Sequence, residues 1–282
     1  MTLIDTHCHI QFKGYDDDRE EVIIRCKEKN VLMNTVGTQQ DTSKKAVELA
    51  EKYDNIYATI GLHPVHLFPT YIDESELAFM SREEEFDEEY YGDLVKSDKV
   101  IAVGETGIDL YHLPKDFSRE EVLTKQKAIF IQQYNFAQKH DLPLVIHVRD
   151  AYEEMIAVLS ESSDSIKGVV HCYGGNWQQA QKFLDLGLYI GFTGIVTFPE
   201  KKNNPQPTLD LLEVVEKCPL DRILVETDAP YLAPQAYRGK KCEPWMVEEV
   251  VKKVAEIRKK SVKEIENITF ENALNLFSKI QR

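Results

Sequence analysis

The feature of this sequence that most constrains its fold is the regular alternation of short β-rich runs with helical patterns along 282 residues. Runs of aliphatic and β-branched residues predict eight strands, at 3–9, 31–36, 56–62, 100–105, 142–147, 168–171, 188–191 and 223–228. Helical patterns follow these runs, at 17–29, 41–53, 73–96, 118–139, 150–162, 175–186, 207–217 and 244–258, with one or two extra helices over 261–280. Strands separated by helices form parallel βαβ units, and eight units are the number that closes a barrel.

We therefore expect an α/β protein with a single (β/α)8 TIM barrel domain over residues 1–282 and extra C-terminal helices. Barrels of this class commonly reach about 250 residues as one domain. The structural alternative is a doubly wound open sheet, which usually carries a glycine-rich turn after its first strand. The segment THCHIQF at that position contains no glycine, which favours the barrel.

Targeting signals and cysteine usage restrict the compartment. The N-terminal MTLIDTHCHI has no basic region of a secretory signal, and no apolar run approaches the roughly 20 residues that cross a bilayer. The 5 cysteines are widely spaced and form no CxxC pair, which argues against a disulfide framework or a structural zinc knot. We expect a cytoplasmic protein with no membrane association, and we infer no obligate protein partner.

The net charge limits the size of any nucleic-acid footprint. The chain has 34 basic and 48 acidic residues, a formal charge of −14, which argues against coating long stretches of duplex. A small cleft can still bind phosphate, because two bound divalent cations would reverse the local field. The acidic run EEEFDEEYYGD within 71–93 is typical of a solvated helix face.

Five of the eight predicted strands end on imidazole or carboxylate side chains. The first strand ends with His7 and His9, which the two-residue period of a strand places on one face. Four other strands, the fourth, fifth, sixth and eighth, end on Glu105, His147, His171 and Asp228. Barrel enzymes place their catalytic residues at this end of the strands, so we expect these six side chains to converge.

Four imidazoles and two carboxylates suit a pair of divalent ions better than one closed tetrahedral zinc. The natural assignment gives one ion to His7, His9 and Asp228 and the other to His147 and His171, with Glu105 as a bridge. Two ions about 3.5–4 Å apart can share a water, lower its pKa and stabilise the attacking and leaving oxygens of a phosphodiester. Asp228 can take the proton of that water, so we expect Asp228 and Glu105 to be catalytic. The residues alone indicate a binuclear hydrolase.

The segments around these residues resemble the TatD family of metal-dependent deoxyribonucleases, in the amidohydrolase superfamily. The resemblance runs from residue 4 to 245 and rests on IDTHCHI, GLHP, VGETGIDLY, LPLVIHVRDA, HCYGG, GFTGIVTF, ETDAPYLAP and RGKKCEPW. Glu105 makes the resemblance specific, because many related hydrolases carry a carboxylated lysine at the end of the fourth strand. The resemblance implies nuclease activity, often exonucleolytic, with a divalent ion; Mg²⁺, Mn²⁺ and Zn²⁺ all fit the ligands.

Three further side chains are expected to bind the substrate. His63 follows the third strand and either touches the substrate or is a structural loop histidine. Arg149 stands two residues after His147 and either reaches a phosphate or pairs with a helix. Arg238 lies in a Gly- and Lys-rich loop after the eighth strand, where barrels often bind phosphate.

Other residues beside the motifs have two open interpretations. Glu226 either orients a ligand histidine or pairs within the barrel core. The aromatic residues either stack on a base or pack in the loops; they are Tyr111, Tyr173 and Trp245. His66 and His112 either touch the substrate or, the favoured interpretation, are surface-loop histidines. Cys172 is expected to face away from the metals.

Two positions depart from the family's pattern, both in expected substrate loops. Pro199 and Glu200 follow the TF of the seventh strand, where family members commonly show a lysine. Cys242 stands where an asparagine usually precedes Glu-Pro. Both departures bear on substrate preference and leave the predicted metal ligands unchanged.

We therefore expect a divalent-metal-dependent deoxyribonuclease that hydrolyses DNA phosphodiester bonds from single-stranded or frayed ends through a metal-bridged hydroxide. The alternative enzyme is a binuclear hydrolase of another ester, for example one that deacylates aminoacyl-tRNA, because the same nucleophile attacks a carbonyl. A non-catalytic barrel would need a broken ligand set, and no ligand is missing from this sequence.

Overall fold

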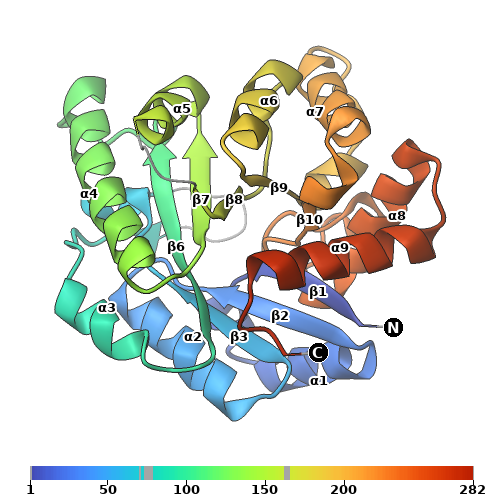
Figure 1. Ribbon diagram of the computed structural model, residues 1–282, viewed down its shortest axis with the longest axis horizontal. Coiled ribbons are helices and arrows are strands. Elements are labelled where there is room, and N and C mark those ends of the chain that lie inside the picture. Colours follow the sequence, from blue (N-terminus) through green and yellow to red (C-terminus); the bar gives the residue numbers. More distant parts are fainter. Residues whose placement is uncertain (1, 70, 73–78, 162–165, 282) are drawn as a thin grey trace.

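A computed structural model describes residues 2–69, 71–72, 79–161 and 166–281 of the protein. Eight parallel strands form one sheet that curls into a nearly closed barrel (Figure 1). In sheet order they are β1 (Leu3–Cys8), β2 (Val31–Val36), β3 (Ile56–Ile60), β6 (Val100–Asp109), β7 (Leu144–Arg149), β8 (Gly168–Val170), β9 (Tyr189–Phe192) and β10 (Ile223–Val225). The fold class predicted from the sequence is confirmed.

The barrel closes between its first strand and the segment just after its last strand. The backbone N–H of Asp228 donates to the carbonyl of His7 at 2.8 Å, and that of His9 donates to the carbonyl of Ala229 at 2.7 Å. A parallel bridge also joins Cys8 to Ala229. Closure therefore occurs where three of the predicted metal ligands leave their strands.

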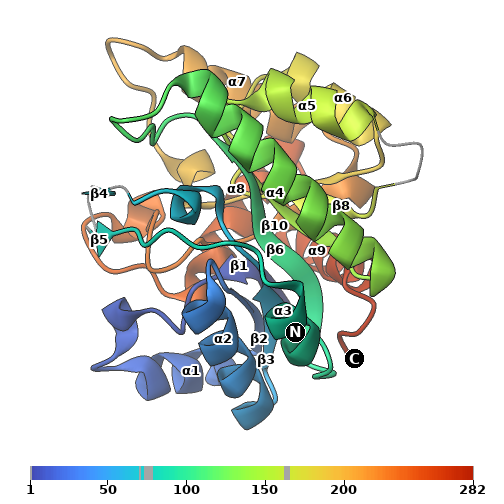
Figure 2. The same cartoon turned by 90° about the vertical axis from the view of Figure 1, so that its left-hand side faces the viewer.

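Helices surround the strands, and α4 lies along β6 in both ribbon views (Figures 1 and 2). The helices are α1 (Arg19–Glu28), α2 (Gln40–Lys52), α3 (Glu88–Leu94), α4 (Arg119–Lys139), α5 (Tyr152–Ser160), α6 (Trp177–Asp185), α7 (Gln206–Lys217), α8 (Val247–Arg258) and α9 (Val262–Leu276). No helix within the described ranges combines the length and apolar content that a membrane span requires.

The C-terminal helix α9 seals one end of the barrel interior. Side chains from the strands form one buried cluster with residues of α9 and its tail; they include Ile4, Tyr57, Ile101, Val145, Leu224, Ala273, Leu276 and Phe277. These strand residues lie toward the N-terminal ends of their strands. The opposite, C-terminal end of the barrel interior is not filled by this apolar cluster, and polar side chains lie there.

The helix predicted over 73–96 was wrong over 79–87, where the structure has no helix, and correct over Glu88–Leu94. Two short strands, β4 (Tyr71–Ile72) and β5 (Phe79–Met80), pair antiparallel at the start of this region, and residues 73–78 lie outside the described residues. The helix α3 begins only after Asp87, whose carboxylate accepts hydrogen bonds from the N–H groups of Glu89 and Tyr90. This cap starts the helix inside the acidic run, because side-chain carboxylates favour helix N-termini over helix interiors.

The strand β6 is longer than predicted, so Glu105 lies in its middle rather than at its end. The strand continues to Asp109, paired with β7 as far as Arg149. Gly107 has a φ of +153°, and a Cβ at this position would lie 2.0 Å from the carbonyl oxygen of His147. Only glycine allows β6 to approach β7 this closely.

Candidate metal centre

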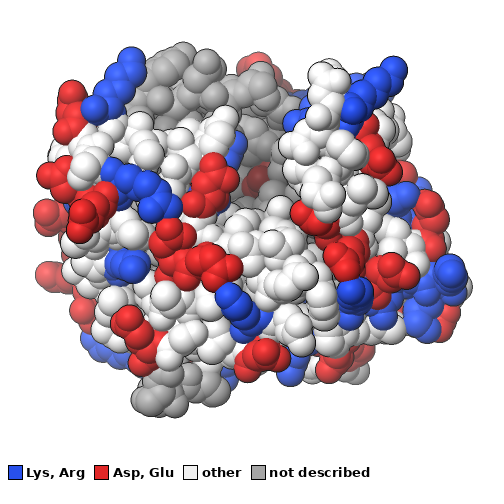
Figure 3. Space-filling view, turned by 90° about the horizontal axis from the view of Figure 1, so that it is seen from above, with Lys and Arg blue, Asp and Glu red and all other residues white. Residues whose placement is uncertain are grey.

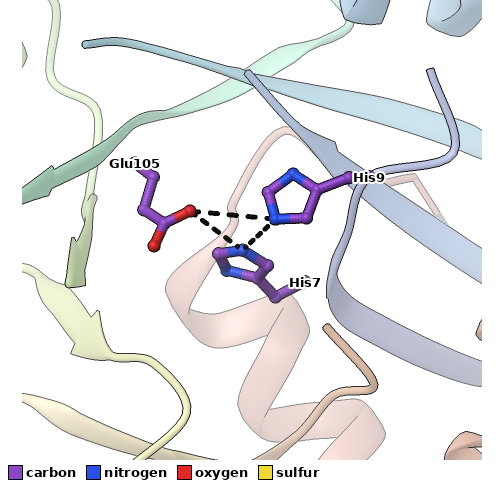
Figure 4. A group of neighbouring side chains, drawn as sticks. All are labelled: His7, His9 and Glu105. Carbon is purple, nitrogen blue, oxygen red and sulfur yellow. Dashed lines mark hydrogen bonds and ion pairs between the residues drawn. The ribbon is translucent and has the colours of Figure 1, made fainter. Parts of the chain in front are cut away.

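Glu105 lies at the centre of the converging side chains, and its two carboxylate oxygens face different groups of histidines. Oε2 lies 3.4 Å from Nε2 of His7 and 3.8 Å from Nε2 of His9 (Figure 4). Oε1 lies 2.8 Å from both Nδ1 of His147 and Nε2 of His171. The sixth residue, Asp228, places Oδ1 3.3 Å from Nε2 of His9. The structure thus brings all six predicted ligands together.

The spacing of the donor atoms fits metal ions. Nε2 of His7 lies 3.3 Å from Nε2 of His9, and Nδ1 of His147 lies 3.4 Å from Nε2 of His171. Two nitrogens bound to one tetrahedral ion at about 2.0–2.1 Å are separated by roughly 3.4 Å. Imidazole lone pairs that face each other at this distance around a shared carboxylate suit a cation between them.

The second ring nitrogen of three ligand histidines faces an acceptor, which leaves the first nitrogen available to a metal. Nδ1 of His9 lies 2.7 Å from the carbonyl of Val36. Nε2 of His147 lies 3.2 Å from Oδ2 of Asp109. Nδ1 of His171 lies 3.5 Å from Oε1 of Glu226. The buried Nδ1 of His7 has no hydrogen-bond partner among the described residues, and the 3.5 Å contact of His171 with Glu226 is an ion-pair distance without hydrogen-bond geometry.

Glu226 lies fully buried beneath His171. Its Oε1 also accepts a hydrogen bond from the backbone N–H of Cys172, and its Oε2 accepts one from Thr6 at 3.4 Å. Gly191 makes room for it, since a Cβ there would lie 2.7 Å from the carboxylate. Of its two interpretations, this arrangement favours the orientation of His171 over a pairing within the core.

His63 differs from the ligand histidines in its tautomer. Its Nδ1 accepts a hydrogen bond from the backbone N–H of Val65 at 3.2 Å, so Nε2 carries the proton of the neutral ring. That nitrogen lies 3.3 Å from Oε1 of Glu105. Burial and the neighbouring His147 lower the pKa of His63 to about 4, which keeps the ring neutral near pH 7. His63 therefore presents an N–H donor to the centre.

Without metal ions, protons on the histidines compensate the buried carboxylates. Burial alone would raise the pKa of Glu105, but His171, His63 and His7 reverse this effect and hold it well below its usual range. Burial would lower the pKa of His147, but Asp109 and Glu105 raise it to about 9. The pKa values of His9, His147 and His171 are raised while those of His7 and His63 are lowered, so three of the imidazoles carry the compensating positive charge.

An open cavity of about 650 Å³ leads to the centre and contains the residues predicted to bind substrate. Arg149 and Arg238 both line it, each stacked on an aromatic ring. The guanidinium of Arg149 lies 4.1 Å from the ring centre of Tyr111, and that of Arg238 lies 4.5 Å from that of Phe198. A stacked guanidinium keeps its planar edge of N–H donors for phosphate oxygens.

Asp109 is the residue that sequence reasoning missed. Its Oδ1 accepts hydrogen bonds from the backbone N–H groups of Tyr111 and His112, both at 2.9 Å. Its Oδ2 lies 2.9 Å from Nδ1 of His112 and 3.2 Å from Nε2 of His147. The two-residue period of a strand that continues past Glu105 places Asp109 on the same face, and this signal could have revealed it.

Of the remaining residues singled out in the sequence, two aromatic residues pack away from the cavity and three other residues line it. Tyr173 is buried and donates its hydroxyl to the carbonyl of Asn176 at 2.8 Å, and the indole N–H of Trp245 bonds to Glu243. His66 and His112 line the cavity rather than an outer surface. Cys172 also borders the cavity, and burial raises the pKa of its thiol well above the usual range, which disfavours the reactive thiolate.

The two departures from the family's pattern lie outside the cavity wall. Cys242 lies in a loop after β10, as predicted, but its side chain is fully buried and does not line the cavity. The neighbouring Lys241 pairs with Asp18 at 2.6 Å. Pro199 and Glu200 are exposed in the segment after β9.

Comparison with known proteins gives one consistent relationship. A family model described as TatD related DNase matches residues 4–278. The chain is 39% identical over 277 residues to YabD of Bacillus subtilis, an uncharacterized metal-dependent hydrolase, with 98% of each chain covered. It is 32% identical over 283 residues to the 3′-5′ ssDNA/RNA exonuclease TatD of Cronobacter sakazakii, again with 98% of each covered.

The crystal structure of YjjV, a TatD homologue from Escherichia coli K12, matches the fold with a TM-score of 0.80 at 28% identity, over 98% of each chain. The family match and the relatives above 30% identity each extend over nearly the whole chain. The chain therefore belongs to the TatD related DNase family and is a metal-dependent hydrolase.

Proposed function

We propose that this protein is a nuclease that hydrolyses DNA phosphodiester bonds from single-stranded or frayed ends, with two divalent ions held by the six converging side chains. The observation that carries the proposal is the position of Glu105, whose two oxygens face separate histidine groups and can bridge two ions. The name of the Cronobacter sakazakii relative, a 3′-5′ ssDNA/RNA exonuclease, supports nucleic acid as the substrate class.

In this proposal His7, His9 and Asp228 hold one ion, and His147 and His171 hold the other. Bound there, the ions supply Lewis-acid stabilisation of phosphate oxygens and a water of lowered pKa. Asp228, with 17% of its side chain accessible against 5% for Glu105, is the ligand carboxylate that would accept a proton from a water held at this site. The N–H of His63 donates to a substrate oxygen, and Arg149 and Arg238 hold flanking phosphates.

The surface charge favours a short stretch of nucleic acid over a long duplex. Figure 3 shows one face of the molecule on which Lys and Arg are interspersed with Asp and Glu, without a continuous basic field. Extended duplex binding depends on many neutralised phosphates. Two arginines at the cavity match the few phosphates of a strand end.

A substrate panel with metal-loaded protein tests the proposal. The panel contains end-labelled single-stranded DNA, blunt duplex, closed circular duplex, RNA, a lactone and aminoacyl-tRNA, and Glu105→Gln protein is the control for contaminating nucleases. We expect hydrolysis of single-stranded ends and none of closed circles. Hydrolysis of the lactone or of aminoacyl-tRNA with no cleavage of DNA would instead establish the other-ester alternative.

A further inference from the structure

Tyr111 is an exposed aromatic residue on the wall of the cavity. Seven large hydrophobic side chains are exposed in the described part of the chain; they are Ile24, Tyr111, Leu113, Phe117, Ile131, Leu209 and Val262. Only Tyr111, at 58% exposure, also lines the cavity that holds the metal centre. An aromatic ring exposed on the wall of such a cavity is available to a ligand that enters it.

The position of Tyr111 is fixed from two sides. Its backbone N–H donates to Oδ1 of Asp109 at 2.9 Å, and the same carboxylate contacts His147. Arg149 covers the ring at 4.1 Å, while the ring of His112 meets it edge-on at 4.9 Å. The ring is therefore held in one place relative to the metal ligand His147 through a single intervening residue.

We propose that Tyr111, backed by Arg149, forms a stacking subsite for one nucleobase next to the cleaved phosphodiester. This inference rests on the proposed nuclease function and specifies how the strand is held. The ring accepts a base on its exposed surface, and the guanidinium edge of Arg149 contacts a phosphate of the same strand. Because every base has a π-face, the subsite recognises a nucleotide without selecting its sequence.

Phe117 provides a matched control within the same loop. It is 41% exposed but does not line the cavity, and its ring packs against Phe68 with centroids 4.8 Å apart. Removal of Phe117 therefore tests the loss of an exposed aromatic ring near the cavity without removing the proposed subsite.

The experiment measures kcat/KM for short single-stranded oligonucleotides in which one abasic residue is moved along the strand, within a few nucleotides of the cleaved bond. For wild-type protein we expect one position at which base removal lowers kcat/KM about 5- to 150-fold, the range that base–aromatic stacking supports. Tyr111→Ala should lower kcat/KM on intact DNA by a similar factor and should abolish the further loss at that abasic position. Tyr111→Phe should retain the wild-type profile, and so should Phe117→Ala.

Two outcomes overturn the subsite, and they differ from a failure of the proposed function. If wild-type protein cleaves DNA but Tyr111→Ala keeps the full abasic loss at every position, stacking on Tyr111 is wrong while the nuclease function stands. If Phe117→Ala reproduces the effect of Tyr111→Ala, the loop as a whole rather than the subsite is responsible. If wild-type protein cleaves no DNA in the substrate panel, the function fails and the inference fails with it.

Discussion

The substitution Asp109→Asn tests how the protein orients a metal ligand from outside the first coordination sphere. Asp109 faces four N–H groups: two backbone amides at Oδ1, and Nδ1 of His112 and Nε2 of His147 at Oδ2. Burial would raise the pKa of Asp109, but His112 and His147 reverse this effect and keep it well below the usual range. The carboxylate is therefore ionised and accepts from all four.

An asparagine cannot replace this carboxylate. Its side chain has one acceptor oxygen and one NH2 donor, so in either orientation two N–H groups meet a donor. If the amide NH2 faces His147, the ring proton moves to Nδ1, the nitrogen that faces Glu105 and the proposed ion. Loss of such an outer hydrogen bond typically weakens metal affinity 10- to 100-fold. This factor corresponds to about 1.4–2.8 kcal/mol of binding free energy.

The assay is isothermal titration of chelator-stripped protein with Mn²⁺ or Zn²⁺. We expect one of two binding events to weaken by that factor in Asp109→Asn. Asp116→Asn, which changes an exposed aspartate in the loop after β6, should leave both constants unchanged. Circular dichroism and thermal unfolding confirm that each variant is folded. Metal affinity within twofold of wild type in a folded Asp109→Asn protein would refute the orienting role.

Three further outcomes are expected. Glu105→Ala should lower kcat more than His63→Ala, because the first change removes a group shared by both ions; equal losses in steady-state assays would count against bridging. The folded-state pKa of His147, about 9, lies above its unfolded value near 6.5, so its contribution to stability is complete below pH 6.5 and is lost as pH rises to 9. Thermal unfolding of stripped protein should show this loss, while Mn²⁺ affinity should increase over the same window; a flat affinity profile would contradict it. Binding of a short single strand to Asp228→Asn protein should show a log–log salt slope of about −1.4 to −2.8, from two to four phosphate contacts, and Arg238→Ala should weaken different sequences equally; a slope near ten contacts would exclude end-on binding.

The barrel could be predicted because the sequence patterns of its strands and helices are periodic and extend over only a few neighbouring residues. Each buried strand of a parallel barrel is a short apolar run, and each run is followed by a helical pattern. The helix predicted over 73–96 was wrong over 79–87 because the acidic run carries little apolar periodicity, and a local cap at Asp87 decides where the helix begins. The role of α9 in sealing the barrel interior depends on tertiary packing that no local pattern records.

The six converging residues could be predicted because five of them lie at or near the end of a strand, where barrel geometry brings distant residues together, and Glu105 lies on the same face of β6. Asp109 was missed because the end of β6 was placed four residues too early, at Glu105. The tautomer of His63 depends on one backbone N–H of Val65, and the pairing of Tyr111 with Arg149 depends on the register of two strands. Such contacts are set by the fold rather than by residue type.

The most direct test is a stepwise titration of metal-free protein with Mn²⁺, in which bound ions per chain and the hydrolysis of end-labelled single-stranded DNA are measured on the same samples. We predict no hydrolysis in stripped protein, an increase with occupancy up to two ions per chain, and no recovery in Asp228→Asn protein. Full hydrolysis without metal, or a fully loaded protein that leaves single-stranded ends intact, would contradict a two-metal nuclease.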